Sequence, residues 1–313
     1  MKFQADFFKE EVREGFYIEP MMKCAWAVEM DILEDMQNVC KENNIRYFAD
    51  GGTLLGAIRH RGYVPWDDDI DIAMLRPDYD RFLDIIKNKW MEKYELNIPG
   101  VTEKYNMTFT KIYNTKEISF QTEHLKKFHG FPYVTGVDIF PLDIVPDDEN
   151  ERNAFIQLYL IVINAASKMK DNPKEINECL PDIENLCKCK IDRNGDIGKQ
   201  LCQLAELISK SYKGTNNSKM TMMSYVNCKI YLKREWYEET EWKTFETMLL
   251  PVPKHYHEVL TAWYGDYMTP VQGTATHDYP FYKKQMEKLE EKMVKQLYGV
   301  EVSEVSEVSK ESN

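Results

Sequence analysis

An acidic run that alternates with aliphatic residues places the strongest constraint on what this chain can fold into. Residues 66–74 read WDDDIDIAM, with four aspartates among five consecutive positions. Successive side chains of a strand point to opposite faces, so a strand over residues 67–74 places Asp67, Asp69 and Asp71 on one face. Ile70 and Ile72 then lie on the other face. The chain therefore needs a sheet that buries the aliphatic face of this strand.

Three carboxylates on one face repel one another unless a counter-charge lies between them. Two unit charges about 4 Å apart repel by roughly 4 kcal/mol at an effective dielectric constant near 20. A divalent cation bound by Asp69 and Asp71 relieves this repulsion, and ligands that are all oxygen atoms favour Mg²⁺ or Mn²⁺. The alternative is a solvated acidic turn, which the alternation with isoleucine disfavours.

A glycine pair precedes the acidic run. Gly51, Gly52 and Thr53 lie between a predicted strand over residues 45–49 and a predicted helix over residues 53–60. Glycines let the backbone approach a ligand, and free N–H groups at the start of a helix bind phosphate oxygens. A tight turn explains the pair about as well when it is taken alone. Next to an acidic strand, the pair predicts a phosphate cradle of the kind found in phosphoryl or nucleotidyl transfer sites.

Further candidates lie around these two segments. Asp138, between Val137 and Ile139, is the expected third metal-binding carboxylate on a strand over residues 136–140 that ends at Pro141. Asp143 follows that proline and is expected in a turn or in a supporting role. Arg59 and His60 provide positive charge for phosphate, although compensation of the helix dipole explains them about equally well.

The hydrophobic pattern predicts a mixed α/β fold, classed as α+β, with a nucleotidyltransferase-like mixed sheet flanked by helices. Helices are expected over residues 22–40 and 77–90, and a further strand over residues 107–113. The predicted divisions are a catalytic core over residues 1–149, a mostly helical subdomain over 150–237 that could bind an acceptor, a C-terminal segment over 238–300 that packs on the core, and a disordered tail over 301–313.

Composition limits the classes of partner. Forty Lys and Arg against 52 Asp and Glu give a net charge of −12, which disfavours nucleic-acid binding. Seven cysteines, an odd number, indicate reduced thiols and a cytoplasmic protein. The cluster from Cys179 to Cys202 lacks a zinc-ligand spacing. Residues 1–15 do not resemble a signal peptide, and the longest apolar run, residues 158–166, is too short to cross a bilayer. Peripheral association with the inner face of the membrane stays open, as does the oligomeric state.

The stretch GGTLLGAIRHRGYVPWDDDIDIAM, residues 51–74, resembles the LicD family of phosphocholine transferases and, more distantly, fukutin-related protein. The similarity continues through VDIFPLD at residues 137–143 and through residues 245–270, and is followed by His277. It covers most of the chain from about residue 40 to residue 280.

The resemblance implies a nucleotidyltransferase fold and a Mg²⁺-dependent phosphotransferase. Such an enzyme moves a phospho-alcohol group, most often phosphocholine from CDP-choline with CMP as the leaving group, to a sugar hydroxyl of a cell-surface glycan. The acceptor can be a lipid-linked glycan, a lipopolysaccharide or a teichoic-acid-type precursor. Carried over by position, Asp69 and Asp71 are the metal-binding pair and Asp138 is the third acid, with Asp67 in support. Trp66 could contact a cationic donor group and His277 could orient substrate.

Two other functions fit the same motifs. A nucleotidyltransferase would move NMP from CTP or ATP to a small molecule or a protein and release pyrophosphate. A non-catalytic module would only bind a nucleotide or a cation, which the intact Asp69, Asp71 and Asp138 disfavour.

Overall fold

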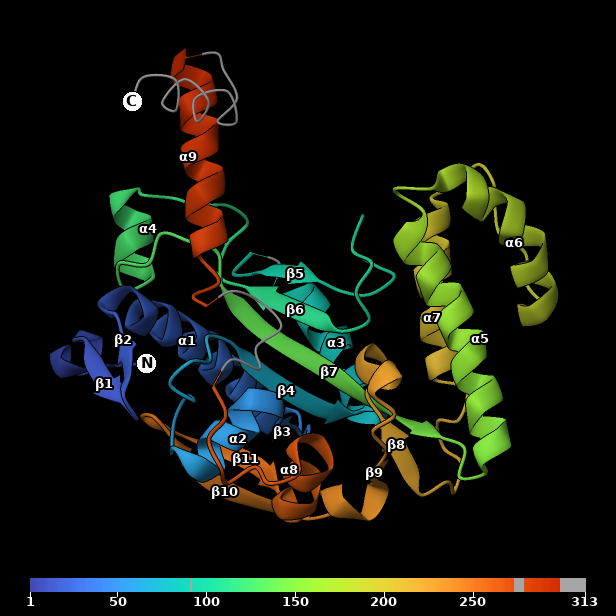
Figure 1. The fold of residues 1–313 in the computed structure, drawn as a ribbon, viewed down its shortest axis with the longest axis horizontal. Coiled ribbons are helices and arrows are strands. Elements are labelled where there is room, and N and C mark those ends of the chain that lie inside the picture. Colours follow the sequence, from blue (N-terminus) through green and yellow to red (C-terminus); the bar gives the residue numbers. More distant parts are fainter. Residues whose placement is uncertain (91, 273–278, 299–313) are drawn as a thin grey trace, which may run out of the picture.

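A seven-stranded mixed sheet forms the centre of the molecule (Figure 1). The computed structural model describes residues 1–90, 92–272 and 279–298. Strand β4 runs parallel to β7, and the other pairs of neighbours are antiparallel. The prediction of a mixed sheet flanked by helices is confirmed. The strands lie in the order β3 (Phe48–Ala49), β4 (Ile70–Leu75), β7 (Gly136–Val145), β6 (Thr110–Tyr113) and β5 (Glu95–Asn97), and β8 (Lys219–Thr221) and β9 (Leu232–Lys233) extend it from the end of β7.

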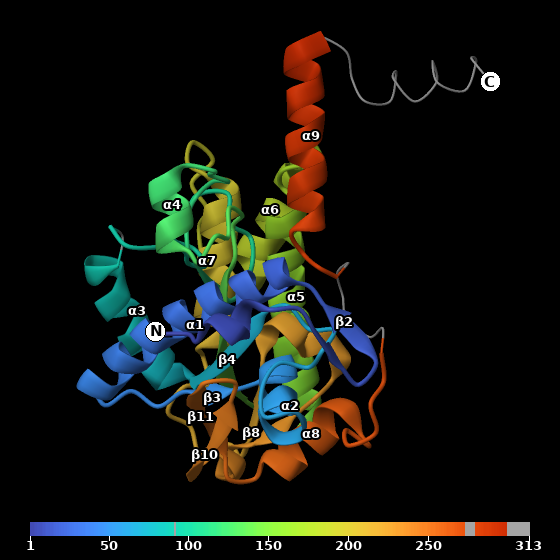
Figure 2. The same cartoon turned by 90° about the vertical axis from the view of Figure 1, so that its left-hand side faces the viewer.

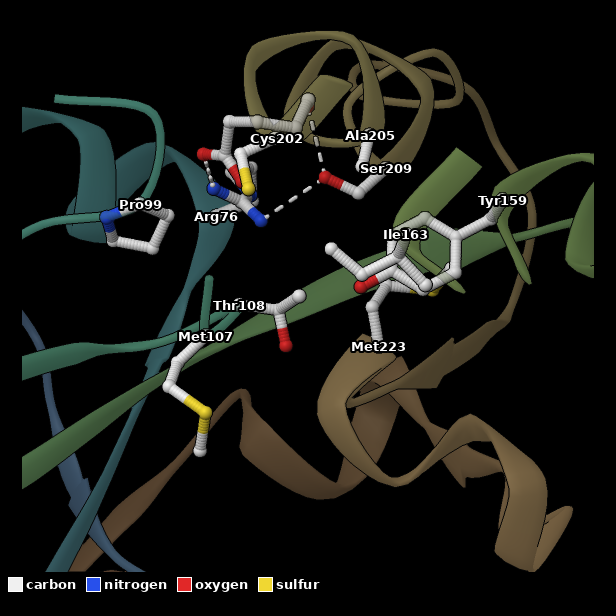
Figure 3. A pocket seen from close by; sticks show the side chains of 11 residues that line it. Arg76, Pro99, Met107, Thr108, Tyr159, Ile163, Cys202, Ala205, Ser209 and Met223 are labelled. Atoms are coloured by element: carbon white, nitrogen blue, oxygen red, sulfur yellow. Dashed lines mark hydrogen bonds and ion pairs between the residues drawn. The ribbon is translucent and has the colours of Figure 1, made fainter. Parts of the chain in front are cut away.

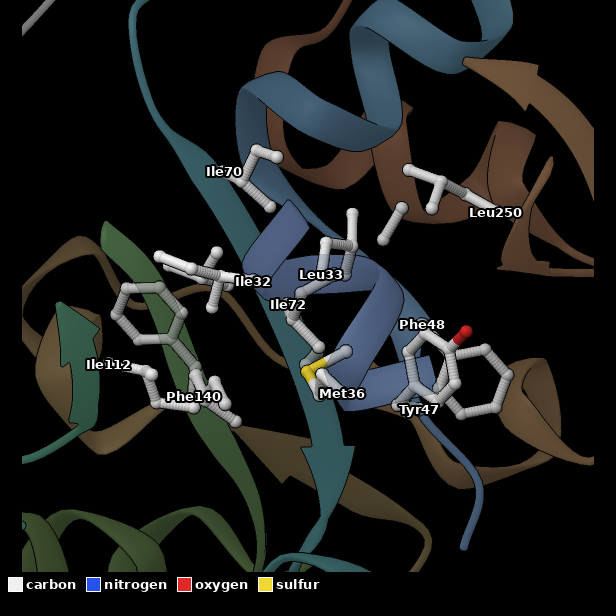
Figure 4. Close-up of a cluster of buried hydrophobic side chains, with 14 of the residues drawn as sticks. Ile32, Leu33, Met36, Tyr47, Phe48, Ile70, Ile72, Ile112, Phe140 and Leu250 are labelled. Carbon is white, nitrogen blue, oxygen red and sulfur yellow. The ribbon is translucent and has the colours of Figure 1, made fainter. Parts of the chain in front are cut away.

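Helix α1 (Pro20–Glu42) packs on the aliphatic face of this sheet. Proline at its first turn suits the start of a helix, and the apolar stripe predicted from the sequence is fully buried from Met22 to Cys40. Figure 4 shows Leu33 and Met36 of α1 beside Ile72 of β4. Helices α2 (Gly51–Arg59) and α3 (Arg76–Lys89) flank β4 in sequence and pack against it.

Three helices form a separate lobe with its own hydrophobic core, beside the sheet in Figure 1. Asp148 caps α5 (Glu149–Lys168) and Asp196 caps α7 (Ile197–Ser209), each through its side chain, and α6 (Pro173–Cys187) lies between them in sequence. The segment 150–237 is helical only in this first part. From Lys219 the chain returns to the sheet as β8 and β9 with two short 3₁₀ turns, Met223–Cys228 and Arg234–Tyr237.

The remaining elements lie around the central sheet or project from it. A hairpin of β10 (Thr240–Phe245) and β11 (Met248–Pro253), not predicted from the sequence, buries Phe245 and Leu250 in the main core. Helix α9 (Lys283–Tyr298) projects from the body, as both views show (Figures 1 and 2). No helix in the described ranges is both long and apolar enough to span a bilayer. The other elements are β1 (Glu11–Arg13), β2 (Phe16–Ile18), α4 (Thr122–Lys127), α8 (Tyr256–Tyr264) and a 3₁₀ turn, Ala5–Phe8.

Two strand predictions near the site were wrong in their boundaries. The acidic strand begins at Ile70, so Asp67 and Asp69 lie in the preceding loop and only Asp71 is on the strand. Strand β7 does not end at Pro141 but continues to Val145. Along one edge, β7 pairs with β6 as far as Ile139 and with β8 from Asp143 onward. Pro141 therefore lies between two hydrogen-bond ladders on that edge, where its missing N–H is tolerated.

Candidate active site

A row of charged side chains crosses three neighbouring strands in register. Asp71 of β4 lies opposite Asp138 of β7, and Asp138 lies opposite Lys111 of β6. Residues in register on adjacent strands point to the same face, so all three side chains share the face that α1 does not cover. Ile70 and Ile72 point to the other face and are fully buried. Strand alternation and pairing together thus bring two carboxylates and an ammonium group side by side.

The loop before β4 adds further carboxylates to this row. One oxygen from each of Asp69, Asp71 and Asp138 can be chosen so that all three lie within 4.8 Å of one another. The same is true of Asp67, Asp68 and Asp69. Asp69 therefore belongs to both groups, although it precedes the strand. Asp68 is buried and accepts a hydrogen bond of 2.6 Å from the backbone N–H of Phe281, so it ties the loop to the C-terminal segment.

The glycine pair lies directly against these carboxylates. Gly51 has φ +52°, and a Cβ on it would collide with the Asp71 carboxylate. A Cβ on Gly52 would collide with the Asp67 carboxylate. Any other residue at these positions would push the acids away from the start of α2. The backbone of the cradle predicted from the sequence thus lies directly against the carboxylates of Asp71 and Asp67.

Thr53 and Asp50 support the row from behind. The Thr53 hydroxyl is buried and accepts a hydrogen bond of 2.9 Å from the backbone N–H of Asp71, so it positions Asp71 instead of lining the cavity. Asp50 caps α2 by accepting from the Gly51 N–H at 2.8 Å. Its other oxygen is buried without a hydrogen-bond partner among the described residues. Burial raises the pKa of Asp50 to about 7, although the Gly51 N–H acts in the opposite direction.

Burial and mutual repulsion make the negative charge of this cluster costly. Burial, and then the carboxylates of Asp69 and Asp138, raise the pKa of Asp71 well above its ordinary value. Burial and the carboxylates of Asp69 and Asp68 do the same to Asp67. Such a set of oxygen donors fits a divalent cation, because a cation removes the repulsion that otherwise drives the carboxylates to take up protons. Asp69, Asp71 and Asp138 are therefore suited to hold Mg²⁺ or Mn²⁺.

Among the described residues, the cations near this region include Lys111 and Arg59. Lys111 contacts both oxygens of Asp138, at 2.9 and 3.0 Å. Burial by itself would lower the pKa of Lys111, but attraction to Asp138 outweighs burial and the pKa is raised. Arg59 lines the same cavity and donates a hydrogen bond of 2.6 Å to the backbone carbonyl of Tyr267. His60 is not among the described cavity-lining residues; it lies 3.2 Å from Glu14, and burial lowers the pKa of its ring.

The carboxylates lie in the wall of a large cavity of about 1420 Å³ between the sheet, α5 and the C-terminal segment. Its wall near the carboxylates is aromatic. Trp66 lies in this wall next to Asp67, and the rings of Tyr225 and Trp263 meet edge to face with centroids 5.7 Å apart. The wall on α5 consists of Tyr159, Leu160, Ile163, Asn164 and Ser167. The cavity thus lies between the central sheet and the helical lobe.

Asp143 lies outside this site. Of the two predicted alternatives for Asp143, a turn or a supporting role, the turn is wrong. The residue lies on β7, where Arg76 donates hydrogen bonds to both of its oxygens at 2.6 and 2.7 Å. Arg76 also reaches Glu206 and Ser209 of α7, and Figure 3 shows its side chain pointing toward Ser209. Asp143 therefore helps to fasten the helical lobe to the sheet and does not belong to the carboxylate cluster.

Sequence reasoning missed several residues of the site. Lys111 and Asp50 gave no local signal beyond the alternation of polar and apolar residues around Lys111. Tyr225 lies in a segment predicted to be helical. Predicted His277 and the predicted tail over residues 301–313 lie outside the described residues. All seven cysteines are free thiols. Neither of the two sets of neighbouring aspartates described above includes a cysteine.

Comparison with known proteins identifies this arrangement. Residues 44–158 match a family model described as LicD/FKTN/FKRP, nucleotidyltransferase domain. The lipopolysaccharide cholinephosphotransferase LicD of Haemophilus influenzae is 28% identical over 241 residues, which cover 76% of this chain and 88% of that protein. The ribitol 5-phosphate transferase FKRP of Mus musculus is 32% identical over 65 residues, or 21% of this chain and 13% of that protein. An uncharacterized protein of Rickettsia typhi is 42% identical over 55 residues, 18% of each chain. Residues 44–158 thus match the LicD/FKTN/FKRP nucleotidyltransferase domain, and the family resemblance predicted from the sequence is confirmed.

Proposed function

We propose that this protein transfers phosphocholine from CDP-choline to a sugar hydroxyl of a cell-surface glycan or of its lipid-linked precursor. The similarities to the lipopolysaccharide cholinephosphotransferase LicD and to the ribitol 5-phosphate transferase FKRP support a phosphotransferase that moves a phospho-alcohol group. The observation that carries the proposal is the in-register pair Asp71 and Asp138, which lies with Asp69 against the glycine turn at one side of a large cavity.

Asp69, Asp71 and Asp138 would hold Mg²⁺ or Mn²⁺, which supplies charge neutralisation at the donor phosphates when it is bound. The backbone around Gly51 and Gly52 offers the close approach that a phosphate needs, and Arg59 adds a cation in the same wall. The acceptor oxygen attacks the phosphorus that carries the alcohol, the bond from this phosphorus to CMP breaks, and CMP leaves. The hydroxyl proton passes to a carboxylate of the cluster, Asp138 or a neighbour.

The two remaining walls suit the two substrates. Trp66, Tyr225 and Trp263 offer ring faces and edges close to the carboxylates, and such aromatic groups bind quaternary ammonium groups. The α5 wall, with Asn164, Ser167 and Tyr159, offers hydrogen-bonding groups suited to sugar hydroxyls. We therefore assign the donor to the aromatic wall and the acceptor to the helical lobe. We also propose that the enzyme works in the cytoplasm, with peripheral association at the inner face of the membrane where a lipid-linked acceptor would lie.

The test is thermal melting of the purified protein in Mg²⁺ with CDP-choline, CDP-ribitol, CDP-glycerol, CTP or ATP. A ligand at 100 times its Kd stabilises the fold by about 2.7 kcal/mol. Stabilisation by CDP-choline that needs Mg²⁺ and is lost in Asp71→Asn, together with release of CMP when a glycan acceptor is added, supports the proposal. Lys126→Met, at an exposed lysine that does not line the cavity, is the control and keeps the response.

A nucleotidyltransferase is the second candidate, because the matched domain is of that type and the same carboxylates serve either leaving group. Stabilisation by CTP or ATP and release of pyrophosphate, with no response to any CDP-alcohol, would replace the first proposal by this one. A shift with CDP-ribitol or CDP-glycerol alone would keep the reaction and change the alcohol.

A further inference from the structure

Lys111 pairs with a carboxylate of the row and is also exposed to the cavity. Its side chain is 27% exposed, its Nζ contacts both oxygens of Asp138, and it lies over the Tyr113 ring at 5.6 Å. It also lines the cavity that contains the carboxylates. An ammonium group has three N–H donors. Asp138 is the only hydrogen-bond partner of Nζ within the described ranges, so a further N–H is available to a ligand in the cavity.

This pairing puts Lys111 in competition with a metal ion. Asp138 is one of the three carboxylates suited to hold the cation, and Lys111 already neutralises it. A divalent cation at Asp69, Asp71 and Asp138 would weaken the attraction between Asp138 and Lys111, because like charges repel over such short distances. Lys111 then lines the cavity in which a phosphate would bind against the metal.

The other cations in or near the cavity do not share this position. Arg59 is held by the backbone carbonyl of Tyr267. Lys116 is exposed and forms no ion pair with a described residue. Arg76 grips Asp143 and Glu206 away from the carboxylate row, in an arrangement that serves the fold. Lys111 alone among these pairs with a metal-binding carboxylate and also faces the cavity.

We propose that Lys111 binds two anions in turn: the Asp138 carboxylate in the metal-free site, and a phosphate oxygen of the donor once a divalent cation occupies Asp138. This inference rests on the proposed phosphotransferase function and adds a specific positioning residue to it. Lys111 then weakens the binding of the metal alone and strengthens the binding of a diphosphate in the presence of the metal. A residue that merely stabilises the fold would not affect the two ligands in opposite directions.

Isothermal titration calorimetry on the full chain separates the two effects. Mg²⁺ is titrated first by itself, and inorganic pyrophosphate is then titrated at saturating Mg²⁺. In Lys111→Met, we expect Mg²⁺ to bind about 5-fold more tightly, because a nearby positive charge is gone. Pyrophosphate is expected to bind at least 10-fold more weakly, because a charge-assisted hydrogen bond is lost. Lys111→Arg should restore most of the pyrophosphate affinity, and Lys126→Met, at an exposed lysine that does not line the cavity, should match the unmodified protein in both titrations.

Two results would overturn the proposal. If Lys111→Met weakens Mg²⁺ and pyrophosphate together, the lysine only holds Asp138 in place. If neither affinity changes in Lys111→Met, the lysine serves no ligand. Thermal melting of each variant shows that it is folded, and Lys111→Arg provides the readout if Lys111→Met does not fold. Neither probe contains an alcohol or a glycan, so failure to turn over CDP-choline would contradict the proposed function and leave this test readable.

Discussion

Strand β7 carries two buried aspartates, Asp138 and Asp143, whose surroundings differ. Asp143 receives both of its hydrogen bonds from one buried arginine, Arg76, which also binds Glu206 of the helical lobe. Asp138, five residues earlier, lies opposite Asp71 in the wall of a cavity and pairs with Lys111. An aspartate that a buried arginine binds away from the cavity fastens two parts of the fold. An aspartate that lies beside other carboxylates in a cavity wall is suited to serve a ligand instead.

Asp71→Asn should separate catalysis from stability most sharply. We expect phosphotransfer to fall by about 10³-fold, because a ligand of the cation that stabilises the transferred phosphate is weakened. The melting temperature should stay the same or rise, since one charge leaves a cluster whose members repel each other. Turnover of CDP-choline and thermal melting of the metal-free protein measure the two quantities. A folded variant with near-normal turnover would remove Asp71 from the site.

Arg76→Met should give the reverse pattern. Removing the arginine leaves the buried Asp143 without its ion-pair partner, while Glu206 keeps Lys210 at 3.0 Å. Breaking a buried ion pair in this way costs about 3–5 kcal/mol of the free energy of unfolding. Urea unfolding measures this loss. Arg81→Met, on the exposed side of the same helix, is the control and should cost about 1 kcal/mol or less. Equal losses in the two variants would mean that the Arg76 network does not fasten the lobe.

Gly52→Ala tests the contact between the glycine turn and the carboxylates. The new Cβ would displace the Asp67 carboxylate, so we expect Mg²⁺ affinity to fall by about 10-fold to 100-fold. Gly198→Ala is the matched control, because a Cβ there meets its nearest atom at an ordinary 3.4 Å. Calorimetric titration with Mg²⁺ compares the two variants. An unchanged affinity in Gly52→Ala would show that Asp67 does not support the metal site.

The pH dependence of stability should show the smallest effect. Burial raises the pKa of Asp50 to about 7 from its ordinary value of 3.8, so the folded protein binds a proton between about pH 4 and pH 7 that the unfolded chain has lost. Stability of the metal-free protein should therefore fall as the pH rises through this window, by a few degrees in melting temperature. Asp50→Asn should flatten this dependence. The same slope in the variant would assign it to other carboxylates.

The local sequence pattern was sufficient to find the carboxylates and the glycine turn, because strand alternation and turn formation depend on neighbouring residues. It was not sufficient to predict which of these residues contact one another in the folded protein. Lys111 and Asp138 are 27 positions apart, and Arg76 and Asp143 are 67 apart, so only strand pairing and helix packing bring them together. The sequence could not show that the Thr53 hydroxyl accepts a hydrogen bond from the Asp71 N–H, since this depends on how α2 lies against β4. Nor could it show that His60 lies against Glu14, in the turn between β1 and β2. The predicted metal ligands and donor remain predictions.

The size of the cavity has a consequence for the stereochemistry of the reaction. At about 1420 Å³ it exceeds the 300–1,000 Å³ of a pocket for one small ligand, so donor and acceptor can be present together. Direct attack of one on the other is a single in-line displacement, which inverts the configuration at phosphorus. A donor made chiral at the transferred phosphorus by sulfur and oxygen isotope substitution should therefore give a product of inverted configuration. Steady-state kinetics should accordingly show intersecting lines for the two substrates, the signature of a ternary complex.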